Sequence, residues 1–289
     1  MKTILTFIPK NDSIIDRLIE SARKYDYELE TVSNNFNRNY SQVLNNCLEE
    51  SKNYLFLNPW EYIISPPQKT DNLCYVSIID GEIISKEIRI FPGTCKFANP
   101  VYPIIDSSTN NLSCCVIGSS STNFRYDPNL VYEWRAKEPL NPKPLYYQAI
   151  SLLQQGKYKD FLTTSSQYMR MNPSISISGT MNKYYYALVS FTVNKDYKSA
   201  IQNLIQCLSI NICMAEFWCL LGDIYYELND YNKAIDFYQN ALLLGSRRLR
   251  NDKWPMIVSK YEEYPQNMIK SCLKLTENNH FILPLTDDA

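Results

Sequence analysis

Two short polar segments follow apolar runs in the first quarter of the chain, and their side chains are the best placed for chemistry. The segment PKND at 9–12 follows the apolar run at 4–8, and NPWE at 58–61 follows the run at 54–57. If both runs are strands of an open α/β sheet, ligands bind at their carboxyl ends. The acids and amides of these two segments are therefore the first candidates for a site.

Other catalytic arrangements find little support in the sequence. The only histidine, His280, lies near the end of the chain in a segment expected to be exposed, which disfavours Ser-His and Cys-His nucleophile pairs. The nine cysteines include no Cys-x-x-Cys spacing for a metal, and the seven glycines form no phosphate-binding loop. Glu49-Glu50 and Glu262-Glu263 are better interpreted as helix surfaces than as acid/base pairs.

Composition limits the class of protein and its partners. With 289 residues, 45% of them apolar and 20% charged, the chain is expected to hold two domains. A net charge of -1 without a dense basic run predicts no nucleic-acid binding. No apolar run approaches the roughly 18 residues of a membrane span, and the N-terminus favours a first strand over a signal peptide. Scattered cysteines, odd in number, favour reduced thiols and a cytoplasmic location.

The segments around the two polar sites alternate between strand and helix patterns. Three strands separated by two helices predict right-handed crossovers onto a parallel sheet, so this part is expected to be α/β. Asp80-Gly81 then predicts a β-hairpin. The expected elements are a strand over 4–8, a helix over 14–22, a strand over 28–32, a helix from Ser41 with Cys47 facing inward, a strand over 54–57 and hairpin strands over 73–79 and 82–91.

A helical hairpin is predicted over 215–244. Large and small residues recur there at steps of three and four on both sides of the polar break Asn229-Asp230, which places them on facing sides of two helices. Small residues let the two backbones approach closely. The residues that carry this pattern are Trp218, Leu221, Gly222, Tyr225, Ala234, Tyr238 and Ala241.

The same unit recurs upstream. The segment DYKSAIQNLIQCL matches DYNKAIDFYQNAL in steps of 34, from Tyr197 to Tyr231 and from Ala200 to Ala234. A weaker copy contains Tyr158, which precedes Tyr197 by slightly more than one period because SISIS at 174–178 is an insertion. The order of residues resembles the tetratricopeptide repeat, whose period is about 34 residues, and three copies suffice for a continuous core.

The segments before the repeats resemble glycosyltransferase family 2 proteins that join a GT-A domain to such repeats. The resemblance rests on FIPKNDSIIDRLIESA, NYSQVLNNCLEESKNYLFLNPWEYI and KEIRIFPGTCKFANPVYPI, in that order. It implies a reduced GT-A-like, Rossmann-like sheet domain followed by a repeat solenoid. The nucleotide-sugar cleft that it implies comprises Phe7, Pro9, Asn11, Asp12, Asn45, Asn58, Trp60 and Glu61.

The chain departs from that family at its functional positions. The family's Asp-x-Asp pair, which holds a divalent metal, is replaced by Asn58 and Trp60, so only Glu61 remains and Mg²⁺ or Mn²⁺ is not expected to bind. The helix arginine is Leu44, the nucleoside-contacting segment is deleted, and the His-Glu pair is Tyr102-Pro103, which leaves no evident general base. These losses favour a catalytically silent domain without a cofactor.

By the repeat family's pattern, the concave groove of the solenoid is lined by Tyr146, Asn182, Tyr185, Glu216, Cys219, Asp223 and Tyr226. This lining is aromatic and mildly acidic, which favours a peptide with aromatic or basic anchors. The alternative is a surface packed against another part of the same chain. A capping helix that includes Met268 and Cys272 is expected to close the solenoid.

Two functions therefore remain open. The favoured one is a protein-binding or scaffold module with a degenerate transferase-like domain. The alternative is an active, metal-independent glycosyltransferase that uses Asn58 and Glu61 on a protein or glycan acceptor. The sequence does not determine the oligomeric state. The expected organisation is a degenerate transferase-like domain at 1–125, a linker at 126–143, repeats at 144–250, a capping helix at 251–275 and a tail at 276–289.

Overall fold

The computed structural model describes residues 3–7, 15–32, 40–59, 61–67, 73–98, 104–105, 112–119, 128–171, 175–245 and 253–280. The chain divides into two compact units. The first comprises 1–157 with 253–255, and the second comprises 158–252 with 256–289. This division falls well beyond the end of the expected linker at 143, so the first predicted hairpin spans both units.

The first unit contains a mixed α/β sheet that begins with three parallel strands. β1 lies between β2 and β3 and is parallel to both, as strand–helix–strand connections require. The parallel sheet predicted for this segment is confirmed. Its elements are β1 (Thr3–Phe7), α1 (Asp16–Lys24), β2 (Glu28–Val32), α2 (Tyr40–Asn45) and β3 (Asn53–Phe56).

The remaining strands extend the sheet in the order β2-β1-β3-β6-β5-β9-β4. β6 is antiparallel to both β3 and β5, and β5 and β6 form the predicted hairpin with Asp80 opposite Ile83. Gly81 in its turn has a φ of 58°, a conformation that glycine adopts without strain. The strands are β4 (Glu61–Ser65), β5 (Cys74–Asp80), β6 (Ile83–Pro92), β9 (Leu112–Ser119) and a separate pair, β7 (Phe97–Ala98) and β8 (Ile104–Ile105).

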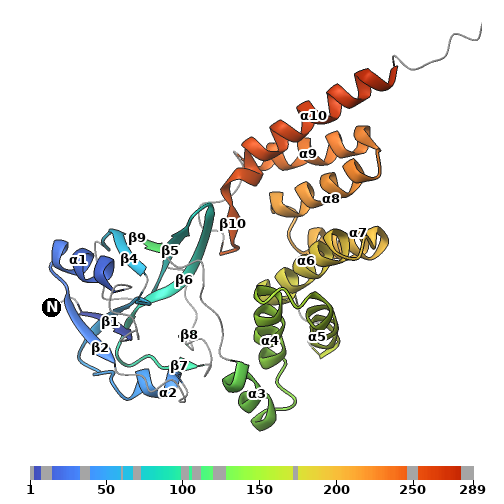
Figure 1. The fold of residues 1–289 in the computed structure, drawn as a ribbon. Coiled ribbons are helices and arrows are strands. Elements are labelled where there is room, and N and C mark those ends of the chain that lie inside the picture. Colours follow the sequence, from blue (N-terminus) through green and yellow to red (C-terminus); the bar gives the residue numbers. More distant parts are fainter. Residues whose placement is uncertain are drawn as a thin grey trace, which may run out of the picture. The chain divides into compact units, whose positions relative to one another are not determined.

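Each face of the sheet has its own core. Neighbouring residues of a strand point to opposite faces, so Ile4 packs with Leu18 and Ala22 of α1, whereas Leu5 packs with Leu44 of α2. The helices thus cover different faces, with α1 beside β4 (Figure 1). The Ser21 hydroxyl accepts a hydrogen bond of 3.1 Å from the Ile63 amide, which ties α1 to β4.

The expected linker contains a helix. α3 (Pro128–Lys137) packs against α4 (Lys143–Gln154), and the apolar cluster of Leu130, Val131 and Trp134 on α3 also contacts Tyr40 of α2. Because α3 buries these side chains, residues 128–137 belong to the first unit and do not form an extended connection.

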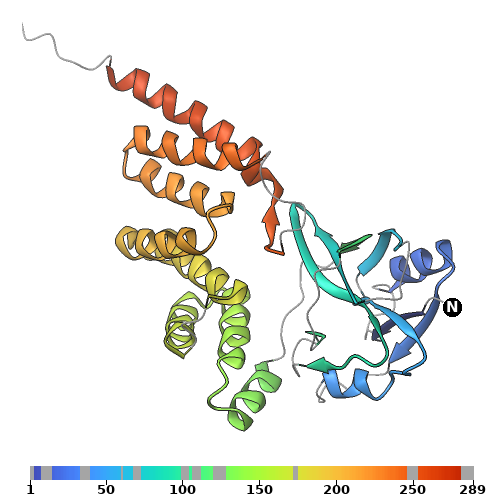
Figure 2. The same ribbon diagram turned by 180° about the vertical axis from the view of Figure 1, so that it is seen from behind.

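The second unit is built of helices. α6 packs on α7, α8 packs on α9, and α10 lies along α9 (Figure 2). Residues 276–280, expected in a loose tail, continue α10. The elements are α5 (Tyr158–Met171), α6 (Ile177–Thr192), α7 (Tyr197–Ile210), α8 (Ala215–Glu227), α9 (Tyr231–Gly245), the extended segment β10 (Met256–Ile257), the 3₁₀ turn η2 (Val258–Tyr261) and α10 (Glu263–His280).

The backbone repeats with the sequence period. Lys195 and Asn229, one period apart, both have a positive φ, of 53° and 60°, and each precedes an aspartate that accepts a hydrogen bond at the start of the next helix. Gly156, with a φ of 71°, precedes Lys195 by the same longer step that separates Tyr158 from Tyr197. The same turn conformation therefore occurs at the equivalent position of all three copies, which supports the weak first copy.

The small residues of the last hairpin act as predicted. A Cβ atom on Gly222 would lie 2.5 Å from Cε1 of Tyr238, and Ala234 and Ala241 are fully buried in the same cluster. One expectation in the first unit is wrong, because Cys47 is exposed beyond the end of α2 and does not face inward. The cysteines whose thiols the structure describes are all free.

No helix in the described part of the chain is both long and apolar enough to cross a membrane.

Candidate functional site

Only some of the residues expected at the sheet edge lie close together. Asn58 and Glu61 are adjacent in a tight turn after β3, closed by a hydrogen bond of 2.9 Å from the Glu61 amide to the Asn58 carbonyl. Phe7 packs edge-on against Tyr40 and Phe56 and belongs to the core. Pro9, Asn11, Asp12 and Trp60, also expected in this cleft, lie outside the described residues.

Glu61 is bound on several sides by its own chain. Its carboxylate accepts hydrogen bonds from the backbone amide and the side-chain amide of Asn58, at 2.7 and 3.0 Å. Arg89 of β6 donates a third from Nη2 at 3.1 Å. Glu61 and Arg89 are only 3% and 2% exposed. The one acid that remains at the metal-binding position of the resemblance is thus the centre of a buried ion pair.

The electrostatics of this cluster favour a structural role. Burial raises the pKa of the Glu61 carboxyl, while Arg89 and the two Asn58 donors act in the opposite direction. The Arg89 guanidinium also lies 3.0 Å from Glu87 and stacks 5.1 Å above the Phe56 ring. A carboxylate that already receives three hydrogen bonds must give up part of this network before it can accept a proton from a substrate.

Asn45 also bonds to its own backbone. Its Nδ2 donates to the Phe97 carbonyl at 2.9 Å, and its Oδ1 accepts from the Phe97 amide at 2.7 Å. The side chain thereby completes both hydrogen bonds of one residue of β7, and Ser41 binds the next carbonyl, that of Ala98. Asn45 therefore attaches β7 to α2, and these contacts use both the nitrogen and the oxygen of its side-chain amide.

No group of three or more His, Cys, Asp or Glu side chains suited to a metal ion occurs within the described ranges. The residues present do not fit a divalent cation. Among Asn58, Glu61 and Arg89, the carboxylate is paired with a guanidinium and the amide donates its nitrogen to that carboxylate.

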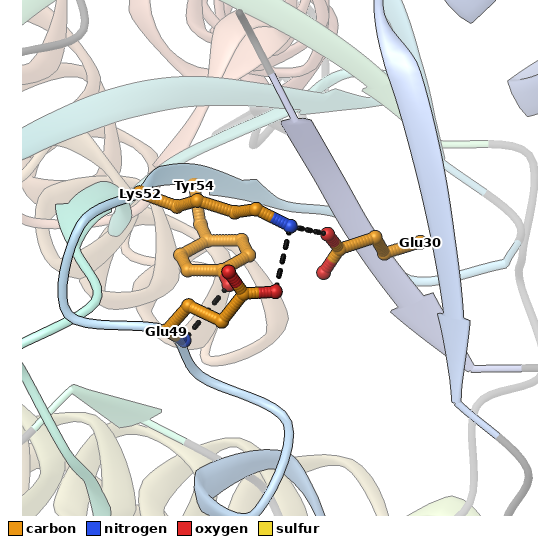
Figure 3. Close-up of polar contacts among 4 residues, drawn as sticks. All are labelled: Glu30, Glu49, Lys52 and Tyr54. Atoms are coloured by element: carbon orange, nitrogen blue, oxygen red, sulfur yellow. Dashed lines mark hydrogen bonds and ion pairs between the residues drawn. The ribbon is translucent and has the colours of Figure 1, made fainter.

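Sequence reasoning missed a second polar cluster, centred on Lys52 (Figure 3). Its Nζ lies 2.6 Å from Glu30 of β2 and 2.8 Å from Glu49, and the Tyr54 hydroxyl accepts from the Glu49 amide at 3.0 Å. The two carboxylates raise the pKa of Lys52. Lys52 directly precedes β3, so this cluster lies at the amino end of that strand, away from the edge where ligands of such sheets bind.

Three of the expected groove residues of α8, Glu216, Cys219 and Asp223, bind the C-terminal part of their own unit. Glu216 is 2% exposed and accepts from the Ile257 amide at 2.6 Å and from the Tyr261 hydroxyl at 3.0 Å. That hydroxyl also accepts from the Ala215 amide at 3.3 Å, at the start of α8, where the side chain of the N-cap residue Met214 makes no capping hydrogen bond. The segment from β10 to η2 therefore covers the first turn of α8.

Further along α8, Asp223 is held in the same way. Its Oδ1 accepts from the hydroxyls of Tyr238 at 2.7 Å and Tyr264 at 2.6 Å, and Lys260 approaches Oδ2 at 3.9 Å. The Lys260 ammonium lies 3.1 Å from the centre of the Tyr264 ring. Between these two acids, the Cys219 thiol donates to the Lys260 carbonyl at 3.4 Å, and burial raises its pKa.

The other expected groove residues differ in accessibility. Asn182 is fully buried, and its Nδ2 donates to the Ser165 hydroxyl at 2.8 Å. Tyr185 and Tyr226 are half-buried and pack against Tyr184 and Tyr231. Tyr146 is half-buried beside Tyr147 and belongs to the first unit. Within the second unit, Tyr185, Asp223 and Tyr226 are thus the expected groove residues that retain partly accessible side chains.

Asp223 gives this unit a testable pH dependence. Burial raises its pKa, with Lys260 and the two tyrosines acting in the opposite direction. A carboxyl with a raised folded pKa stabilises the fold when protonated; this contribution is complete below the unfolded pKa of about 4 and is lost as the pH rises through the folded value. The free energy of unfolding of Asp223→Asn should therefore fall less between pH 4 and pH 7 than that of the wild type, as measured by urea denaturation at each pH.

Asp230→Asn is the matched control. The Lys233 side chain and amide lower the pKa of Asp230, so its contribution is present at neutral pH and lost as the pH falls through the folded pKa. This substitution should change the pH slope in the opposite direction. Equal slopes for Asp223→Asn and the wild type would contradict the expected role of Asp223.

The fold of the second unit defines a class, that of helical-repeat solenoids, since the paired helices α6–α7 and α8–α9 stack with the period seen in the sequence. Comparison with known families gives the particular repeat: a model of the tetratricopeptide repeat matches residues 215–245. These residues are α8 and α9, so the repeat predicted from the sequence is confirmed. No match occurs among curated proteins.

Solved structures give weaker similarities. MamA from Desulfovibrio magneticus RS-1 is 20% identical with a TM-score of 0.39, over 56% of this chain and 86% of that one. The Sgt2 tetratricopeptide domain from Aspergillus fumigatus is 13% identical with a TM-score of 0.39, over 51% and 87%. The first tetratricopeptide domain of Spaghetti (RPAP3), bound to an HSP90 peptide, is 14% identical with a TM-score of 0.38, over 47% and 93%.

Proposed function

We propose that this chain is a protein-binding module, in which the tetratricopeptide repeats bind a segment of a partner polypeptide. Stacked repeats of this kind create extended concave surfaces that serve for binding. The observation that carries the proposal is the repeat match at 215–245 on a helical hairpin that packs with the preceding one. Tyr185 and Tyr226, which are half-buried aromatic residues of the expected lining, favour a partner with aromatic or basic anchors.

The test of protein binding uses the full chain and a peptide library. Peptides that bind should lose affinity for Tyr185→Ala or Tyr226→Ala, because these half-buried rings offer apolar area on the first helices of two repeats. Ile205→Ala is the control, since Ile205 lies on a second helix and is 57% exposed. Peptides that bind all three variants equally would place the binding surface elsewhere, and a library without any binder would contradict the proposal.

We further propose that the α/β unit is a degenerate member of glycosyltransferase family 2 without transferase activity. The order of β1, α1, β2, α2 and β3 supports the resemblance. The buried pair of Glu61 with Arg89 supports the loss of activity, because this acid balances an internal cation. In this proposal Asn58 and Asn45 have structural roles, as their amides bond within the chain.

Calorimetry with UDP- and GDP-sugars, with and without Mn²⁺, tests the loss of activity. No binding is expected up to about 100 μM free sugar nucleotide. A dissociation constant below about 100 μM, equivalent to a free energy of binding stronger than about -5.5 kcal/mol, would instead favour a working, metal-independent transferase. Turnover that is lost in Glu61→Gln while the fold is retained would assign the reaction to that carboxylate.

A further inference from the structure

The two carboxylates expected in the groove, Glu216 and Asp223 of α8, obtain most of their hydrogen-bond donors from one short segment. Within 256–264, the Ile257 amide and the Tyr261 hydroxyl bind Glu216, and the Tyr264 hydroxyl binds Asp223. The Lys260 ammonium lies near Asp223 and over the Tyr264 ring. The segment thus presents an amide, an ammonium and two phenols to two acids.

This segment differs from the repeats in its backbone. If α8, at 215–227, is shifted by one period of about 34 residues, the first helix of a following repeat falls at 249–261. At 256–261 the chain instead forms an extended pair of residues and a 3₁₀ turn. The segment is therefore seated on α8 by individual side chains and one amide, as a bound peptide would be, and not by packing of one helix on another.

Beyond its first turn, the C-terminal helix has further contacts of its own. α10 packs along α9, where Met268 and Cys272 join the apolar cluster of Ala234 and Ala241. α10 begins at Glu263, so Tyr264, which binds Asp223, lies in its first turn. The contacts of Met268 and Cys272 involve neither Glu216 nor Asp223, so the rest of α10 can stay in place while the segment at 256–264 leaves α8. The segment itself contributes Tyr261, which is 2% exposed, to this cluster, so its opening also exposes that ring. Because residues 256–261 form no α-helix, we expect them to open more readily than the helices beneath them.

We propose that residues 256–264 are an intramolecular ligand that occupies the concave face of α8 in the free protein and is displaced by a partner segment carrying a basic residue next to tyrosines. The partner must supply the same chemistry to Glu216 and Asp223, since the buried Glu216 would lose its Ile257 and Tyr261 donors and Asp223 would keep Tyr238 but lose Tyr264. This inference deepens the proposed protein-binding function, because it names the site on the last repeat and the kind of peptide that it takes.

Hydrogen exchange on the free full-length chain tests the opening. The amide of Ile257 and its neighbours in 256–264 should show protection at least about a hundredfold lower than amides in the middle of α8 and α9, as expected for local opening. Equal protection would show that the segment opens only on global unfolding, which overturns the inference. No partner is involved, so this failure would leave the proposed protein binding untouched.

Competition by a synthetic peptide of sequence MIVSKYEEY, residues 256–264, gives the second test. The double variant Tyr261→Phe, Tyr264→Phe removes two hydroxyl donors from the internal segment, so it should bind the peptide about tenfold or more tightly than the wild type does. Tyr231→Phe is the control, because its hydroxyl bonds Asn229 outside this face. Equal binding by all three proteins, or no binding to the double variant with its helix content intact, overturns the inference.

Discussion

Replacement of Arg89 by methionine is expected to lower the free energy of unfolding by about 3–5 kcal/mol, the range found when one partner of a buried ion pair is removed. The physical reason is that Glu61 stays buried and loses its cation. Its remaining donors belong to Asn58, at 2.7 and 3.0 Å. Urea denaturation at pH 7, followed by circular dichroism, measures the loss.

The double variant Glu61→Leu, Arg89→Met provides the matched control. It removes both charges, so it should be less destabilised than Arg89→Met alone, although two side chains have changed. This non-additivity distinguishes an ion pair from mere loss of arginine packing on Phe56. A loss for Arg89→Met as small as that of ordinary surface substitutions, about 0.5 kcal/mol or less, would mean that the pair is not formed.

Gly222→Ala is expected to destabilise the repeat unit by about 1–3 kcal/mol through overpacking. The new methyl group would lie 2.5 Å from the Tyr238 ring, and that ring is fully buried with its hydroxyl bonded to Asp223. Alanine favours a helix over glycine by up to about 1 kcal/mol, which offsets only part of the clash. Thermal unfolding of the variant should show the decrease.

A second substitution tests whether the ring is the cause. In the background Tyr238→Leu the aromatic atoms nearest to Gly222 are absent, so adding Gly222→Ala should cost less there than in the wild type. The same cost in both backgrounds would contradict close packing between α8 and α9 at this point.

Much of the fold could be predicted because its signals are local. The turn Asp80-Gly81, the strand at 28–32 and the regular spacing of Tyr197 and Tyr231 each depend on a few neighbouring residues. Errors arose where a local pattern was weak or was overridden. The helix α3 lies in a segment expected to be a linker, and its Trp134 is buried by residues distant in the sequence.

The candidate sites could be predicted far less well. The sequence identified Glu61 and Asn58 as candidates but did not pair Glu61 with Arg89, which is 28 residues away and reaches it only after β6 joins the sheet beside β3. It likewise placed Glu216 and Asp223 on one side of a helix. Their occupation by Ile257, Tyr261 and Tyr264, which lie far along the chain, had no local signal.

The sequence by itself determined the periodic parts of this protein: an α/β region followed by helical repeats whose last copy is a tetratricopeptide repeat. Hydrophobic period, turn residues and close-packing glycine are properties of short segments, so they can be recognised without the rest of the chain. Only the tertiary structure decided which polar side chains are engaged. A buried acid must find a hydrogen-bond donor, so two acids that follow the same pattern in sequence differ in role once they are buried. Each donor comes from whichever part of the folded chain lies within hydrogen-bonding distance.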